Sequence, residues 1–247
     1  MSPDEHDIMR AVEDEYWWYQ ALRQHVADSI EPPAHVFSVL DAGCGTGGTL
    51  AALRGNFPQA ELTGIDESEH AVTLTAGRNT GAHLARGSVH ELPFAEGSFD
   101  FVLSLDVWSH AGVDDALAAH EVHRVLRPGG KLILNLAAFE FLKGAHDCAT
   151  DVDRRYTRRQ VQALLEGANF QIERLTYWNA AFTPPIALVR WFSRRGLRRE
   201  EARSDFRPLP RFMNTTLQRV AALELSATRH LSLPFGSSLF AVARKHG

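Results

Sequence analysis

The sequence predicts an α/β fold in which helices cover both faces of a doubly wound, mostly parallel sheet of seven strands. From residue 36 onward, short β-rich runs alternate with stretches of helical spacing, a pattern typical of β-α-β units. A glycine-rich run at 43–48 stands between the first β-rich run and the first helical stretch. Sheets of this kind bind ligands where a strand ends and a helix begins, so the two observations agree.

The strands are expected as short apolar runs that end at turn residues or polar residues. They are placed at 36–40, 61–65, 83–85, 99–105, 131–136, 171–178 and 238–244. Helices are expected between them at 46–57, 67–79, 114–126 and 157–168, the last with Thr157 at its cap position. The Pro-Gly-Gly run at 128–130 predicts a turn before the fifth strand.

Two segments lie outside this alternation. Residues 1–35 are expected to form a helical segment, with one helix over 5–30 that carries the aromatic cluster Tyr16-Trp17-Trp18-Tyr19 and a break at Glu31-Pro-Pro. Residues 179–237 separate the last two strands, and a structureless connection of that length is uncommon. We expect a helical cap inserted there, which leaves 36–178 and 238–247 as the α/β domain.

The composition narrows the function classes. The formal net charge is -4, whereas general nucleic-acid binders usually present a basic surface, so no nucleic-acid partner is expected. The two cysteines, Cys44 and Cys148, form neither a disulfide framework nor a zinc site, which favours a reducing, cytoplasmic setting and no metal. No apolar run reaches the roughly 18–20 residues of a spanning helix, so stable membrane insertion is not expected. The oligomeric state stays open.

The glycine loop alone does not identify its ligand. Its residues satisfy G-x-G-x-G, but Gly43, Gly45 and Gly48 also satisfy the dinucleotide pattern G-x-G-x-x-G, and Asp66 follows about 20 residues later in either case. Asp41, just before the loop, disfavours a pyrophosphate because it would repel one. The chain is also short for a separate dehydrogenase domain, and it contains no Tyr-x-x-x-Lys pair.

Four motifs in order make the assignment specific. They are VLDAGCGTG at 39–47, GID at 64–66, LPF at 92–94 followed by SFDFV at 98–102, and EVHRVLRPGGK at 121–131. Over 36–136 the chain therefore resembles the class I S-adenosylmethionine-dependent methyltransferases, which include enzymes of ubiquinone and menaquinone biosynthesis. The resemblance implies a Rossmann-like sheet with an antiparallel last strand, S-adenosyl-L-methionine as cofactor, and an N-terminal helical lid.

The resemblance also implies a set of cofactor contacts. They are Asp41, Gly43, Cys44, Gly45, Asp66, Glu67, Ser88, Val89, the carbonyl of Leu105 and, from the N-terminal helix, Tyr19 and Arg23. Asp66 is expected to accept hydrogen bonds from both ribose hydroxyls. Asp41 either meets the methionine ammonium or only positions the loop. Ser88 replaces an aspartate common in relatives, so the backbone of Val89 is expected to carry more of the adenine recognition.

Acceptor-side candidates follow the fourth and fifth strands. His110 is a candidate general base, because imidazole titrates near neutral pH, although a structural role is the alternative. The candidate acceptor contacts are Trp18, Asp106, His146, Arg155 and Tyr156. For two of these candidates, an alternative to acceptor contact stays open. The aromatic cluster could serve only to anchor its helix, and Arg155 could instead pair with Asp151 and Asp153. The transfer itself needs in-line positioning and exclusion of water, and needs a base only for some acceptors.

These features favour a methyltransferase that acts on a small-molecule acceptor, such as a metabolite or natural-product intermediate. A nucleic-acid methyltransferase is disfavoured, since residues 105–108 lack the Asn/Asp-Pro-Pro-aromatic motif and neither cysteine follows a proline. A scaffold or regulator that binds the cofactor without transferring methyl is the second alternative. The six arginines of 190–203 indicate either a solvated cap helix or contact with an anionic surface.

Overall fold

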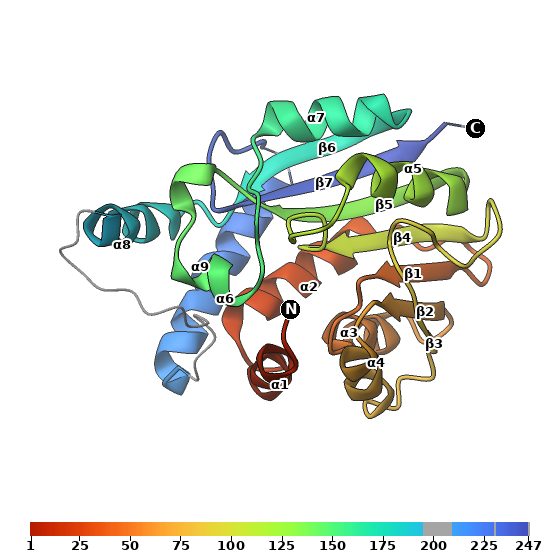
Figure 1. Cartoon of the computed structure of the whole chain (residues 1–247), viewed down its shortest axis with the longest axis horizontal. Helices are drawn as coiled ribbons and strands as arrows, with labels where there is room; N and C mark the ends of the chain where they lie inside the picture. Colours follow the sequence, from red (N-terminus) through yellow and green to blue (C-terminus); the bar gives the residue numbers. More distant parts are fainter. Residues whose placement is uncertain (195–208, 230, 247) are drawn as a thin grey trace.

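A seven-stranded sheet forms the centre of the structure, a computed structural model that describes residues 1–194, 209–229 and 231–246 (Figure 1). The strand order is β3-β2-β1-β4-β5-β7-β6, and β7 runs antiparallel to both of its neighbours. The remaining neighbours are parallel. The strands are β1 Ser38–Ala42, β2 Glu61–Asp66, β3 His83–Arg86, β4 Phe99–Leu105, β5 Leu126–Ala137, β6 Phe170–Trp178 and β7 Ser238–Lys245. The expected doubly wound fold with an antiparallel last strand is confirmed.

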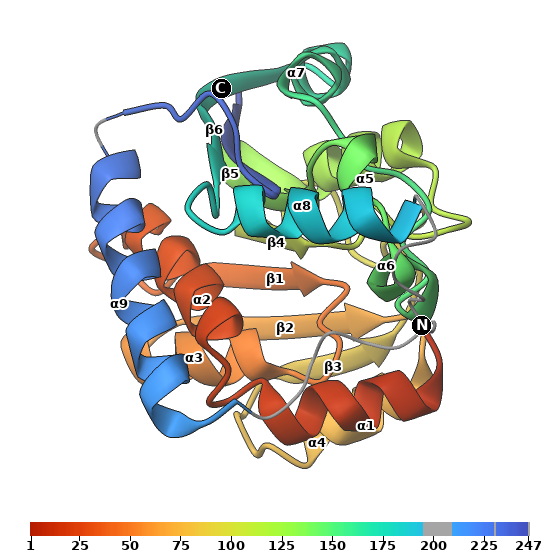
Figure 2. The same cartoon turned by 90° about the vertical axis from the view of Figure 1, so that its left-hand side faces the viewer.

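Helices bury both faces of this sheet. The described helices are α1 Pro3–Val12, α2 Trp17–Ser29, α3 Gly48–Asn56, α4 Glu69–Ala76, α5 Asp115–Val125, α6 Ala145–Ala149, α7 Arg158–Gly167, α8 Thr183–Arg194 and α9 Arg211–Thr228, with a 3-10 turn at Glu140–Leu142. One apolar core lies under α5 and α7, and a second joins the opposite face to α2, α3 and α9. Figure 2 shows α9 alongside α2 on this second face.

The single helix expected over 5–30 is wrong, because the chain forms α1 and α2 with a break between them. At the break, the Glu13 carboxylate turns inward and pairs with two arginines. The α2 helix has no cap from its own N-cap residue, Tyr16. Instead Asn214 of α9 accepts a hydrogen bond from the Trp17 amide (2.9 Å) and donates to the Glu15 carbonyl (2.6 Å). A distant helix thus fixes where α2 begins.

Replacing Asn214 by alanine is expected to reduce the free energy of unfolding by about 1 kcal/mol, the usual cost of losing a helix cap. The variant Asn214→Asp keeps an oxygen that accepts from Trp17 but loses the donor to the Glu15 carbonyl, so its loss should be intermediate. Chemical denaturation of the three proteins measures the difference. Equal losses in both variants would show that the bond to the Trp17 amide does not stabilise α2.

The Pro-Gly-Gly turn expected at 128–130 lies inside β5 instead. Leu126 pairs with Phe99 and Lys131 pairs with Phe101, so the β5 residues between them form an irregularity in the ladder. Gly129 has φ +79°, which glycine adopts without steric cost. The β5 strand therefore starts earlier than its apolar run suggests, because Gly129 and Gly130 lie in a bulge and strand pairing continues on both sides of it.

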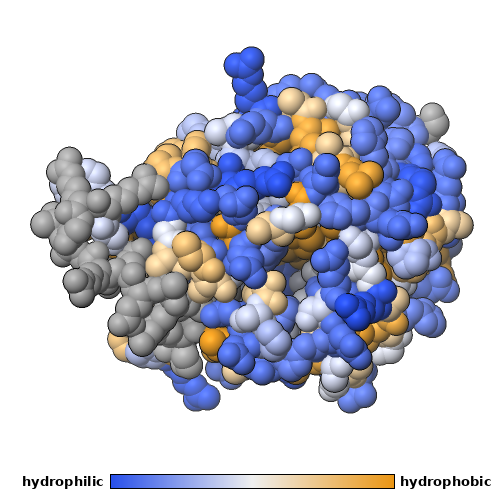
Figure 3. All heavy atoms as spheres, in the orientation of Figure 1, coloured by the Kyte–Doolittle hydropathy of each residue, from blue (hydrophilic) through white to orange (hydrophobic). Residues whose placement is uncertain are grey.

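The segment 179–237 connects β6 to β7 and contains α8 and α9. Most of the arginine-rich run at 190–203 lies outside the described residues. In the described ranges, no helix combines the length and apolar character needed to cross a membrane. On the face shown in Figure 3, polar residues predominate, and apolar residues appear in a hollow between them.

Candidate active site

A cavity of about 600 Å³ lies at the carboxyl ends of β1, β2 and β4. The N-terminal helices, the α/β domain and the connection between β6 and β7 all contribute to its lining. Examples are Met9 and Tyr19 from the helices, Gly43 and Asp66 from the α/β domain, and Ile186 from α8. The volume is in the range of small-molecule sites. The cavity thus lies at the edge of the sheet where the sequence predicts a ligand.

The glycine loop wraps around the end of β2. The amides of Gly43 and Cys44 both donate to the Ile65 carbonyl at 2.9 Å. Gly43 has φ +95°, and a Cβ there would lie 2.2 Å from a methyl of Val107. Gly45 has φ +52° and donates its amide to Asp66 at 3.0 Å. Glycine is therefore required at both positions to bring the backbone against the cavity.

Asp66 ends β2 with a fixed carboxylate. One oxygen accepts from the Gly45 amide, and the other accepts from the Ser68 amide at 2.9 Å. A carboxylate has about four acceptor positions, so this arrangement leaves capacity for two further donors. Asp66 lines the cavity together with Glu67. The geometry suits a ligand with a pair of hydroxyl groups.

Asp41 is buried beneath the loop at 1% exposure and lines the same cavity. Its Oδ1 has no hydrogen-bond partner among the residues that the structure describes. Burial, followed by the nearby Asp66 and Glu13 carboxylates, raises the pKa of Asp41 to about 7. An unpaired buried carboxylate oxygen is costly unless a cation or donor occupies it. The site therefore fits a ligand with an ammonium group.

Not every expected cofactor contact lies at the cavity. Cys44, Val89, Leu105 and Tyr19 line it. The lining residues do not include Ser88 and Arg23. The Ser88 hydroxyl accepts from the His90 amide (3.2 Å), and the Arg23 guanidinium donates to Glu13 (2.8 Å). These local partners do not account for all of Arg23, because its buried Nε has no hydrogen-bond partner among the described residues.

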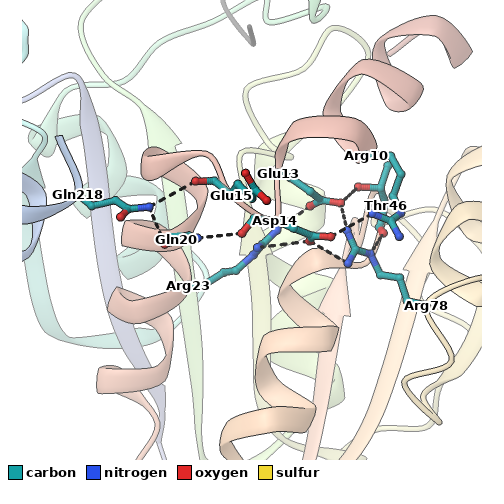
Figure 4. Close-up of polar contacts among 9 residues, drawn as sticks. All are labelled: Arg10, Glu13, Asp14, Glu15, Gln20, Arg23, Thr46, Arg78 and Gln218. Atoms are coloured by element: carbon teal, nitrogen blue, oxygen red, sulfur yellow. Dashed lines mark hydrogen bonds and ion pairs between the residues drawn. The ribbon is translucent and has the colours of Figure 1, made fainter. Parts of the chain in front are cut away.

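A polar network joins the N-terminal segment to the glycine loop (Figure 4). Glu13 accepts from the Thr46 hydroxyl in the loop and forms ion pairs with Arg23 and Arg78. Arg78 also donates to the Thr46 carbonyl at 2.6 Å and pairs with Asp14 at 2.9 Å. Glu13 and Arg78 were not predicted from the sequence, because nothing in their local pattern distinguishes them from surface charges.

Asp106 lies on the acceptor side, directly after β4. It has φ +61° and lines the cavity. Asn135 donates from its amide nitrogen to the Asp106 carboxylate at 2.9 Å, and the Trp178 indole donates to the Asn135 amide oxygen at 2.8 Å. Burial raises the pKa of Asp106 to about 7.

The other acceptor-side candidates have varied surroundings. Trp18, His110 and His146 line the cavity, and Trp18 stacks on Trp178 with ring centroids 5.8 Å apart. Burial lowers the pKa of His110. Arg155 also lines the cavity, but its guanidinium donates to Asp147 at 2.8 Å.

The alternative pairing of Arg155 with Asp151 or Asp153 is wrong, since Asp147 is the observed partner. Tyr156 lies outside the cavity lining. Its hydroxyl donates to Asp115 at the start of α5 at 2.7 Å, and its ring packs in the core under α5 and α7. In the part of the chain that the structure describes, no three His, Cys, Asp or Glu side chains are grouped to hold a metal ion.

Residues 40–134 match a family model described as a methyltransferase domain. The malonyl-[acyl-carrier protein] O-methyltransferase of Dechloromonas aromatica is 36% identical over 129 residues, which are 51% of this chain and 45% of that protein. The demethylmenaquinone methyltransferase of Staphylococcus aureus is 36% identical over 98 residues, 38% of this chain and 40% of that protein. The chain spans about half the length of the first curated relatives it matches.

A solved structure of a geranyl diphosphate methyltransferase in complex with GPP and sinefungin has a similar fold. Its TM-score is 0.62 at 16% sequence identity, covering 92% of this chain and 78% of that one. At this identity the likeness concerns the fold alone.

Proposed function

Residues 40–134 are a domain of the class I S-adenosylmethionine-dependent methyltransferase family, and from this premise we propose that the protein transfers the methyl group of S-adenosyl-L-methionine to a small-molecule acceptor. The observation that carries the proposal is the unpaired, buried Oδ1 of Asp41 beside the Asp66 carboxylate in one cavity. The first group suits an ammonium and the second suits a diol, and the cofactor contains both.

Different residues at the cavity would bind different parts of the cofactor. Asp66 would accept from the ribose hydroxyls and Asp41 from the methionine ammonium, aided by the Leu105 carbonyl. The backbone of Val89 would meet the adenine. When bound, the cofactor supplies a methyl group activated by a sulfonium. The chain then has to orient the acceptor and exclude water, which is where most of the acceleration of such a reaction can arise.

The segments around the cavity support a small acceptor. Met9, Tyr19 and Ile186 all line the cavity, so we propose that residues 1–35 act as a lid and residues 179–237 as a cap that shapes the acceptor site. Several relatives are named for small acceptors, including a fatty-acid O-methyltransferase of Mycolicibacterium smegmatis. Cys44 and Cys148 are free thiols, which supports the proposal of a reducing, cytoplasmic setting.

Incubation with methyl-labelled S-adenosylmethionine and a panel of one phenol, one primary amine, one thiol and one carboxylic acid tests the transfer. Label is expected in at least one acceptor, with S-adenosylhomocysteine formed in equal amount. The Asp66→Ala variant is the control, because label that it transfers does not depend on the cofactor site. Cofactor binding with no transfer to any member of a widened panel would favour a scaffold that only binds the cofactor.

Cofactor affinity is expected to fall at acidic pH. With the pKa of Asp41 raised to about 7 in the free protein, its carboxylate is mostly ionised at pH 8 and mostly protonated at pH 6. An ammonium binds the ionised form, so affinity should fall roughly tenfold between these values. Calorimetric titration with S-adenosylhomocysteine at both pH values measures this. Asp41→Asn should bind weakly and lose the pH dependence; an identical pH dependence in that variant would exclude Asp41 as its source.

A further inference from the structure

Asp106 is held in an unusual backbone conformation at the cavity wall. Its φ of +61° lies in the left-handed region, which costs a non-glycine residue roughly 1 kcal/mol or more and persists only where neighbours fix it. Here the Asp106 amide donates to the Asn135 carbonyl at 2.8 Å, while the Asn135 side chain donates to the Asp106 carboxylate at 2.9 Å. Both bonds to one residue of β5 therefore hold the strained turn in place.

A second hydrogen bond fixes which way the Asn135 amide points. Trp178 is 1% exposed and Asn135 is fully buried. Because the Trp178 indole can only donate, the Asn135 oxygen must face it, and the amide nitrogen must face Asp106. One Asp106 oxygen is thus occupied by a donor of fixed orientation. Asp106 also lines the cavity, where a bound molecule can approach its carboxylate.

The charges around Asp106 come from separate elements. Arg155, which follows α6, acts to lower its pKa, as does the Asn135 hydrogen bond, while burial acts to raise it and dominates. Tyr19 of α2 faces the same region, since Asp106 contributes to raising the pKa of the Tyr19 phenol. No positively charged partner in the described chain forms an ion pair with Asp106, because Arg155 pairs with Asp147.

His110 faces a different set of groups. Besides burial, its pKa responds to the Met1 amino group and His6 of the N-terminal segment, to Asp66 at the end of β2, and to Asp151, which follows α6. Asp106 instead responds to Arg155 and Asn135 on the acceptor side. The His110 backbone bridges Val152, in the segment that also contains Arg155, so the two candidate bases differ in how they are held: a hydrogen bond from Asn135 orients the Asp106 carboxylate.

We propose that Asp106, rather than His110, is the general base, and that the acceptor presents a proton-bearing oxygen or nitrogen to it. This inference rests on the proposed function. A lone pair of that atom forms the bond to the methyl carbon, the carbon–sulfur bond breaks, and its electron pair remains on sulfur. In an alcohol or phenol, the proton moves to the Asp106 carboxylate as that bond forms. In a protonated amine, which has no lone pair, the proton moves to Asp106 before the attack. The acceptor class is thus an alcohol, a phenol or a protonated amine.

Carboxyl titration by ¹³C NMR tests the proposal without any acceptor or cofactor. Difference spectra between the wild type and Asp106→Asn identify the Asp106 signal, and Asp41→Asn identifies the other carboxyl near this range. An Asp106 signal that titrates near pH 7 is expected. A signal that titrates at the ordinary pH of an exposed aspartate, near 4, would overturn the proposal.

Kinetics with whichever phenol or amine takes up label test the role in transfer. Asp106→Asn should lower kcat roughly 10²–10⁴-fold, while its calorimetric affinity for S-adenosylhomocysteine stays like the wild type. Asp106→Glu should recover part of the rate, with a pH profile that rises through a shifted pKa. Asp153→Asn, an exposed aspartate with only a 3.6 Å contact to Lys143, is the matched control.

The proposal would be overturned if Asp106→Asn kept the full kcat. It would also be overturned if the pH profile of the rate were lost in His110→Gln but unchanged in Asp106→Asn. Thermal unfolding checks that each variant folds. If Asp106→Asn fails to fold, the pH profile of Asp106→Glu decides, because a base at this position must shift it. Failure of the wild type to bind S-adenosylhomocysteine would instead contradict the proposed function, and the titration by NMR would still report on Asp106.

Discussion

Glu13→Ala is expected to destabilise the protein by about 3–5 kcal/mol, because it removes the shared acid of a buried ion-pair cluster. The Glu13 side chain is 5% exposed, and those of Arg78 and Arg23 are 6% and 12% exposed. Without Glu13, two guanidinium groups stay buried with less compensation, and the Thr46 hydroxyl loses its acceptor. Chemical denaturation measures the loss, and hydrogen exchange over residues 1–16 shows whether the lid opens first.

Asp14→Ala is the matched control for this change. Asp14 pairs with the same two arginines, but its side chain is 52% exposed. Exposed ion pairs contribute at most about 1 kcal/mol, so this variant should stay close to the wild type. Equal destabilisation by the two variants would show that burial of Glu13 does not stabilise the lid.

Asp66→Ala is expected to weaken cofactor binding by roughly 100-fold. Two charge-assisted hydrogen bonds to the ribose would be lost, at about 1.5 kcal/mol each as the lower limit for such bonds. The Gly45 and Ser68 amides would also lose their acceptor, which loosens the glycine loop. Isothermal titration with S-adenosylhomocysteine at pH 8 measures the affinity.

Glu69→Ala serves as the control near Asp66. The Glu69 side chain is 83% exposed and only approaches Arg86 at 3.9 Å, so its removal should leave cofactor affinity within about twofold. An Asp66→Ala protein that binds as tightly as Glu69→Ala would remove Asp66 from the cofactor site.

The core of the fold could be predicted because its signals are local. Each strand is a short apolar run, and the glycine loop needs particular residues to turn at the end of β1. Asp41 and Asp66 stand at fixed places beside that loop, so the motif alone brings them to one cavity. Predicted element ends differ from the structure by a few residues. The β5 strand begins five residues before its predicted start, because strand pairing with β4 continues across its bulge.

The two-helix structure of residues 1–35 could not be predicted in the same way, because its contacts are distant in sequence. The break between α1 and α2 depends on Arg78 in the sheet domain and on Asn214 in α9. Likewise, Tyr156 stands beside polar residues in the sequence, but its ring is buried in the core and its hydroxyl donates to Asp115 at the start of α5. The relay from Trp178 through Asn135 to Asp106 joins β6, β5 and the end of β4, and only the sheet order brings these together.

We propose that this cavity binds S-adenosylmethionine through Asp41 and Asp66. Calorimetric titration of the wild type with S-adenosylhomocysteine at pH 8, beside a titration with NAD, tests it most directly. We expect one site per chain for S-adenosylhomocysteine, weakened strongly in Asp66→Ala, and no comparable binding of NAD. An absence of binding, or tighter binding of NAD, would contradict the account.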